Sequence, residues 1–130
     1  MDELIEQTKL VLDGKKVKSK NFTKQIAFNA IPHIDLFSDD GYTKEELKMA
    51  NETKKILGSD INLTATCVRL PISVSHSESV NIKFKKSFTV DKVKDALDNF
   101  EGCKVIDKRV DGGYSTPLDA EGKNETFISR

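Results

Sequence analysis

The sequence predicts an α+β fold with a mixed, mostly antiparallel sheet that has helices on one face. Two segments, which follow Thr43 and Thr89, carry apolar residues at helical spacing, and threonine favours helix N-termini. Short segments that are apolar or that alternate between apolar and polar residues lie between and after these two. Between residues 25 and 106 the predicted order is β-α-β-β-α-β, the split βαβ arrangement. The chain has 130 residues, of which 37% are hydrophobic, so we expect one domain over residues 1–130.

The first segment predicts a short helix followed by a basic loop. Residues 2–12 carry a ragged apolar face, and Gly14 ends the helix; the apolar residues are Leu4, Ile5, Leu10 and Leu12. Residues 15–24 hold five lysines and one Val17. A basic run of this kind is typical of a solvated loop rather than of a binding site.

The central part predicts a strand, a turn and the best-defined helix. Residues 25–31 are apolar and Pro32 closes them, because proline cannot donate to a sheet ladder. After a turn at residues 39–41, Thr43 and Glu46 have capping-box spacing, and they predict a helix that runs to about Leu57. Gly58 then fits the position that follows a helix.

The remaining segments predict two strands, a helix and two short strands. Residues 61–74 form a long strand that is either buried on both faces or bulged near Cys67, and either option places Arg69 in a partly enclosed position. Residues 80–85 alternate as a half-exposed strand, and Thr89 caps a helix that extends to Phe100. Residues 103–106 and 126–128 are short strands.

Charge and composition exclude several classes of protein. Twenty-one basic residues balance twenty-one acidic ones, which leaves no electrostatic basis for nucleic-acid binding. No apolar run is long enough for a membrane span, and the acidic start is unlike a signal peptide. Cys67 and Cys103 are too few for a disulfide scaffold and are expected to be structural. We therefore expect a cytoplasmic protein.

One group of residues could bind an amino-acid-like substrate. Glu45 and Lys48 lie three apart on a helix, and Arg69 lies near the start of the segment 69–78, which also carries His76. A carboxylate for an ammonium, a guanidinium for a carboxylate and an imidazole for proton transfer would suit such a substrate. The alternatives are a surface ladder of Glu45 and Lys48, a structural ion pair of Arg69 and a loop histidine. His33 is expected to be a structural or turn residue. The sequence contains no glycine-rich phosphate loop and no local metal-ligand motif.

At these residues the sequence resembles aspartate-semialdehyde dehydrogenases. The resemblance rests on several distinct blocks in one order, namely residues 25–35, 45–49, 65–71, 76–78, 116–120 and 127–130. It implies that Glu45 binds the substrate ammonium, Arg69 its α-carboxylate and Lys48 the phosphate, and that His76 is the acid/base group. It also implies reductive dephosphorylation of aspartyl phosphate by NADPH, through a thioester on a cysteine.

The resemblance covers only the C-terminal portion of that family. The nucleophilic cysteine and the dinucleotide-binding glycines of the family precede the matching region, and neither cysteine of this chain has the context of the nucleophile. We therefore expect the substrate-binding and dimerisation domain, inactive alone and binding no cofactor by itself, with NADP, aspartyl phosphate, aspartate semialdehyde and phosphate as ligands of the complete enzyme. We also expect a homodimer that buries the second face of the sheet. The alternative is a non-catalytic self-association module of the same fold. RNA binding is disfavoured, because the strands carry no run of stacking aromatic residues.

Overall fold

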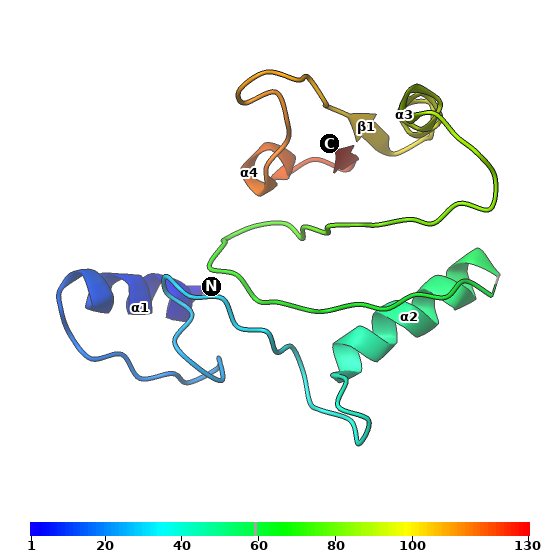
Figure 1. The fold of residues 1–130 in the computed structure, drawn as a ribbon. Helices are drawn as coiled ribbons and strands as arrows, with labels where there is room; N and C mark the ends of the chain where they lie inside the picture. The colour runs from blue at the N-terminus through cyan, green and yellow to red at the C-terminus, as the bar shows by residue number, and fades with distance from the viewer. Residues whose placement is uncertain (59) are drawn as a thin grey trace. The chain divides into compact units, whose positions relative to one another are not determined.

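The computed structural model describes residues 1–58 and 60–130, which form two compact units (Figure 1). The first unit is Met1–Pro71 and the second is Ile72–Arg130. The first contains α1 (Asp2–Leu12) and α2 (Lys44–Leu57). The second contains α3 (Val90–Asp98), β1 (Cys103–Val105), α4 (Pro117–Ala120) and β2 (Thr126–Ile128). Among the described residues, none of the helices has the length and hydropathy that a bilayer crossing demands.

The predicted helices are confirmed, and their ends follow local side-chain chemistry. The Thr43 hydroxyl accepts from the Glu46 N–H, and the Glu46 carboxylate accepts from the Thr43 N–H, so the capping box of α2 is complete. Gly58 ends α2 with φ of 58°, a left-handed conformation that glycine adopts without steric cost. Thr89 caps α3 by accepting from the Lys92 N–H, but α3 stops at Asp98, so Phe100 lies beyond it.

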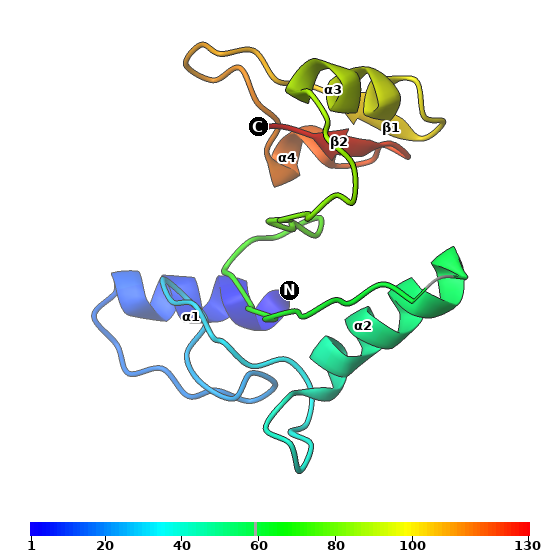
Figure 2. The ribbon, with the colours of Figure 1, turned by 45° about the vertical axis from the view of Figure 1, so that its right-hand side comes forward.

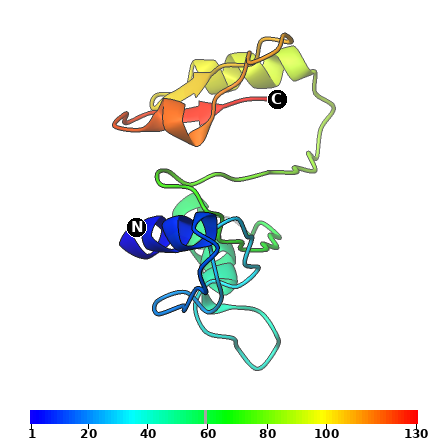
Figure 3. The ribbon, with the colours of Figure 1, turned by 90° about the vertical axis from the view of Figure 1, so that its left-hand side faces the viewer.

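The predicted sheet is wrong in its direction and extent. Within the part of the chain that the structure describes, the only two-stranded ladder is β1 paired with β2, and it is parallel rather than antiparallel. Cys103 pairs with Thr126, and Val105 pairs with Ile128. Helix α3 packs against β1, as Figures 2 and 3 show within the second unit. Over residues 1–58 and 60–130, antiparallel pairing is limited to isolated bridges, one of which joins Ile31 to Arg69.

The segments predicted as the other strands form no ladder in the described residues. Residues 61–74 and 80–85 have no regular secondary structure apart from the bridge at Arg69, and residues 25–31 form a turn that ends at the bridge of Ile31. Val68 is 41% exposed and Leu70 is 46% exposed, so residues 61–74 are not buried on both faces. An alternating sequence fixes which side chains share a face, but a ladder also needs a partner strand to receive its hydrogen bonds.

Helix α1 attaches to the following loop by buried polar side chains instead of its apolar face. Ile5 and Leu12 are exposed, whereas Glu3 and Gln7 are buried. The Gln7 side-chain oxygen accepts from the N–H of Ile26 at 2.8 Å, and Ile26 is one of three fully or nearly fully buried apolar residues among those that the structure describes. The lysine-rich stretch is a loop, as predicted, and it runs beside α1 in Figure 1.

Candidate functional site

Three of the four predicted site residues lie in the first unit, but Glu45 and Lys48 are not among the residues that line the cavity at Arg69. Glu45 and Lys48 lie in the first two turns of α2, and Arg69 lies on the extended segment that ends this unit. His76 is exposed and belongs to the second unit. Its proximity to the other three therefore stays a prediction.

Backbone pairing with Ile31 fixes the position of Arg69. The Arg69 N–H donates to the Ile31 carbonyl at 2.8 Å, and the Ile31 N–H donates to the Arg69 carbonyl at 2.9 Å. Because Ile31 is 5% exposed, this pair ties the backbone of Arg69 to the small apolar core of the first unit. Main-chain hydrogen bonds fix the backbone of Arg69, so its side chain is not needed for positioning and stays accessible.

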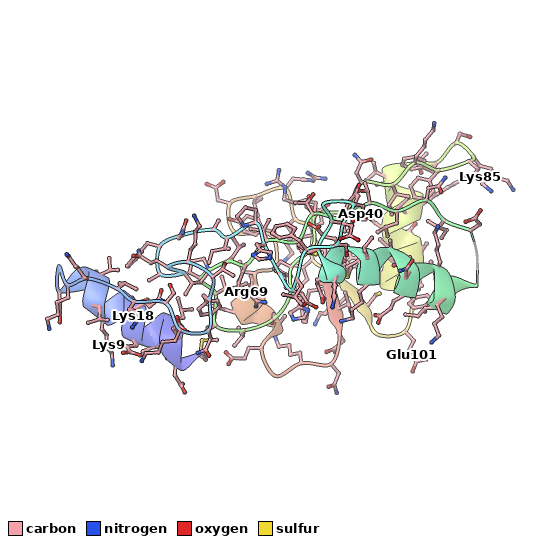
Figure 4. The ribbon with its side chains drawn as sticks, turned by 90° about the horizontal axis from the view of Figure 1, so that it is seen from below. Lys9, Lys18, Asp40, Arg69, Lys85 and Glu101 are labelled. Atoms are coloured by element: carbon pink, nitrogen blue, oxygen red, sulfur yellow. The ribbon has the colours of Figure 1, made fainter. Side chains whose placement is uncertain are left out.

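Arg69, which is labelled in Figure 4, lines a cavity of about 260 Å³. Its guanidinium carbon lies 5.9 Å from the centre of the Phe22 ring, within the range of a cation–π contact. Arg69 is exposed, whereas a partly enclosed position was expected from the sequence. Asn21 and His33 also line the cavity, and the His33 ring stacks on Phe37 with 4.4 Å between centroids. A guanidinium on an aromatic face beside an open cavity can bind a carboxylate in a bidentate manner.

Glu45 and Lys48 form an ion pair with 3.4 Å between Nζ and Oε1. The Lys48 side chain is 52% exposed and that of Glu45 is 31% exposed, so this pair contributes only a few tenths of a kcal/mol to helix stability, roughly. The surface-ladder alternative is thus part of the observed arrangement. The same exposure leaves both charged groups accessible to a ligand.

Glu46 is the residue of this region that sequence reasoning recognised only in part. Its Oε2 accepts from the Thr43 N–H at 2.8 Å within the capping box, and its Oε1 accepts from the Cys67 N–H at 3.0 Å. These two N–H groups hold the pKa of Glu46 below its usual range, and the charge of His33 lowers it further. Capping-box spacing predicts the first bond, but no sequence signal predicts the second, which spans 21 positions.

The second unit carries a separate cluster of charges. The Asp107 side chain is 4% exposed and pairs with Lys94 and Arg109, the latter at 3.2 Å. The hydrogen bond from Lys94 holds the pKa of Asp107 below its usual range. Lys94 lies in α3 and Asp107 follows β1, so this pair ties the helix to the end of the strand. No group of three His, Cys, Asp or Glu side chains in the described ranges is arranged to hold a metal ion.

Comparison with known proteins gives one consistent family. Residues 1–130 match the family model described as semialdehyde dehydrogenase, dimerisation domain. The chain is 44% identical to the aspartate-semialdehyde dehydrogenase of Aquifex aeolicus (strain VF5) over 132 residues, which is 100% of this chain and 39% of that protein. It is 45% identical to the Bacillus subtilis (strain 168) protein of the same name over 137 residues, which is 98% of this chain and 40% of that protein.

Solved structures agree with the sequence comparisons. Aspartate semialdehyde dehydrogenase II from Vibrio cholerae is 34% identical, with a TM-score of 0.85 over 99% of this chain and 38% of that chain. A structure of this Vibrio cholerae enzyme complexed with ASA has a TM-score of 0.82. The chain thus spans about two fifths of the length of the relatives that it matches. The chain belongs to the semialdehyde dehydrogenase family, and it corresponds to the dimerisation domain in the C-terminal portion of those enzymes.

Proposed function

We propose that this chain is the substrate-binding and dimerisation part of an aspartate-semialdehyde dehydrogenase. In the complete enzyme, Arg69 binds the α-carboxylate of aspartyl phosphate or aspartate semialdehyde, Glu45 binds the ammonium, and Lys48 contacts phosphate. The observation that carries this proposal is the placement of Arg69 at an open cavity, in a chain that matches relatives of that name over its whole length.

The chemistry of each side chain suits its proposed role. A planar guanidinium presents two parallel donors to a carboxylate, which a lysine cannot do. A carboxylate on the same helix as a lysine can exchange its intrahelical ion pair for a ligand ammonium, while the lysine turns to phosphate. These groups bind and orient the substrate, and orientation alone lowers the barrier of the reaction.

His76 is proposed as the acid/base group, since an imidazole changes its charge near neutral pH. In the complete enzyme, the reacting group would need a proton to be delivered or removed, and the His76 imidazole would hold or accept that proton. Ser75, beside it, has φ of 65° and donates its hydroxyl to the Pro117 carbonyl at 3.1 Å. This hydrogen bond supports the proposal because it restrains the loop that carries His76.

NADP is proposed as the cofactor of the complete enzyme and not as a ligand of this chain alone. The seven glycines of the sequence nowhere have the GxGxxG spacing that cradles a pyrophosphate at the start of a helix. The residues present therefore do not fit this cofactor. The hydride comes from a site that other parts of the complete enzyme would supply.

We also propose that the chain forms a homodimer, and its exposed surface supports this. The accessible surface is 10879 Å², whereas two separate globular proteins of half its mass would expose about 8,300 Å² together. Many of the exposed side chains are large and apolar, including Val80, Ile82 and Phe84 on the extended segment of the second unit. The surplus of roughly 2,600 Å² is comparable with one protomer's share of a large obligate interface.

Ligand titration of the isotope-labelled chain tests the proposed substrate site. L-Aspartate carries both the ammonium and the α-carboxylate, so it should shift the NMR signals of the Arg69 guanidinium and of the Glu45 and Lys48 backbone amides. Arg69→Lys should weaken this binding about tenfold, because the bidentate contact is lost. Arg109→Lys is the matched control and should leave it unchanged.

Two further probes separate the roles of the individual side chains. Succinate lacks the ammonium, so it should bind at Arg69 without displacing Lys48 from Glu45. Inorganic phosphate should shift Lys48 signals before those of Arg69. The proposal is refuted if aspartate leaves the Arg69 and Glu45 signals unchanged, or if Arg69→Lys and Arg109→Lys bind it equally well.

A further inference from the structure

We infer that Glu46 is a positioning residue, whose carboxylate sets the spacing between the helix that carries Glu45 and Lys48 and the segment that carries Arg69. The inference rests on the proposed function for its meaning, because the spacing matters only if those residues share a ligand. The contacts that support it lie wholly within the first unit.

Both carboxylate oxygens of Glu46 accept hydrogen bonds, in two different directions. Oε2 points back to the Thr43 N–H and closes the capping box at the start of α2. Oε1 points out of the helix to the Cys67 N–H. A helix cap needs only the first of these bonds, so the second is a tertiary contact beyond capping.

The hydrogen bond from the Cys67 N–H to Glu46 lies two residues before Arg69 in the chain. The Arg69 backbone pairs in both directions with Ile31, so residues 67–69 are held at Cys67 by Glu46 and at Arg69 by Ile31. Two anchors on one short extended segment fix both its position and its direction. Because Glu45 and Lys48 flank Glu46 on the same helix, the carboxylate couples their position to that of Arg69.

The group that holds the Cys67 N–H is the ionised carboxylate of Glu46. Hydrogen bonds to a charged acceptor are stronger than neutral ones, and the half-buried position of Glu46 limits competition from water. The backbone N–H groups of Thr43 and Cys67 favour the ionised form of Glu46 and hold its pKa below the usual range. Glu46 itself has no role as a ligand in this account, because its two oxygens already accept backbone N–H groups.

Amide hydrogen exchange separates this role from simple helix capping. Glu46→Met keeps the length of the side chain and removes both acceptors, whereas Thr43→Ala removes only the hydroxyl that caps the Glu46 N–H. In Glu46→Met, exchange at the amides of Cys67 and Arg69 should accelerate about 10- to 100-fold, as expected when a hydrogen bond to a charged acceptor is lost. In Thr43→Ala, the first turn of α2 should exchange faster, while Cys67 and Arg69 stay within about twofold of their original rates.

A second variant keeps the test decisive if Glu46→Met unfolds the first unit. Glu46→Asp keeps the charge but shortens the side chain by one methylene, so it cannot reach the Cys67 N–H from the helix. The same acceleration at Cys67 and Arg69 is expected, with amides of β1 and β2 in the second unit as an internal reference. Unchanged exchange at Cys67 and Arg69 in the Glu46 variants, or equal acceleration in Thr43→Ala, would overturn the inference.

Aspartate titration then tests the consequence for the site. Glu46→Asp should weaken aspartate binding at least fivefold, and Thr43→Ala should not, when both are compared at equal folded fractions. If the unmodified chain shows no response to aspartate, the proposed function is refuted, and hydrogen exchange alone still decides whether Glu46 holds the two segments together. If aspartate binds equally well to Glu46→Asp and to the unmodified chain, Glu46 is not a positioning residue.

Discussion

Replacing Gln7 by methionine should destabilise the first unit, because the Gln7 side chain is a buried hydrogen-bonding link between α1 and the apolar core. Gln7 is 1% exposed, and its Oε1 accepts from the Ile26 N–H at 2.8 Å and from the Ala27 N–H at 3.4 Å. Its Nε2 donates to Glu3 Oε1 at 2.9 Å. Methionine has a similar length and volume, so Gln7→Met removes these bonds without opening a large cavity.

The magnitude follows from the two backbone N–H groups that lose their acceptor. Ile26 and Ala27 are both 0% exposed, so water cannot replace the Gln7 oxygen without rearrangement. Each buried donor left unsatisfied costs about 1–3 kcal/mol, and the long bond to Ala27 contributes at the lower end of that range. Favourable transfer of the methionine side chain offsets part of this loss. After this offset, the free energy of unfolding should fall by about 1–3 kcal/mol.

Urea unfolding followed by helical circular dichroism measures this change, and hydrogen exchange assigns it to the first unit. Both are needed because two compact units can unfold separately, which would violate the two-state assumption. Lys9→Met is the matched control: it places the same new side chain at an exposed position of α1 and should change stability by less than about 0.5 kcal/mol. If Gln7→Met is no more destabilising than Lys9→Met, the buried hydrogen bonds of Gln7 do not stabilise this unit and the reasoning fails.

Three further predictions concern pH, assembly and activity. Hydrogen bonds from backbone N–H groups hold the pKa of Glu3 and of Glu46 below the usual range. The largest contribution comes from the Lys20 N–H for Glu3 and from the Thr43 N–H for Glu46. The contribution of these two carboxylates to folding stability should therefore be complete above the unfolded pKa of about 4.3, and it should be lost as pH falls through the lowered folded pKa. A folding stability that stays constant from pH 6 to pH 3 would contradict this. Sedimentation velocity at micromolar concentration should show a dimer, and a strictly monomeric compact species would refute the homodimer. The chain alone should show no phosphate-dependent reduction of NADP with aspartate semialdehyde, and turnover that survives Cys67→Ala and Cys103→Ala would show that the missing nucleophile is not needed.

The helices could be predicted because their signals are local. The Thr43 hydroxyl and the Glu46 carboxylate lie three residues apart, a distance at which spacing alone determines whether they can reach each other's N–H groups. The Thr89 cap and the Gly58 terminus depend in the same way on neighbouring residues. The strands at residues 103–105 and 126–128 were also found, although their parallel pairing was not.

The predicted antiparallel sheet failed because a strand is not a local structure. Residues 80–85 alternate as a half-exposed strand does, yet Val80 is 68% exposed and Ile82 is 60% exposed, and no ladder forms there in the described residues. The pattern records which side chains need to be covered. It does not record which segment, in this chain or in a partner, provides the hydrogen bonds and the covering surface.

The family, the positions of α1, α2 and α3 and the residue types of the candidate site could be predicted from the sequence, because ordered blocks of residues and helix caps a few positions apart are local signals. The contacts that hold these parts together could be seen only in the folded chain. The bond from Cys67 to Glu46 spans 21 positions, and the bond from Ile26 to Gln7 spans 19. Any carboxylate or amide on a helix could in principle accept from a distant N–H. Which one does so depends on how the loops bring the two groups together as the chain buries its few apolar residues.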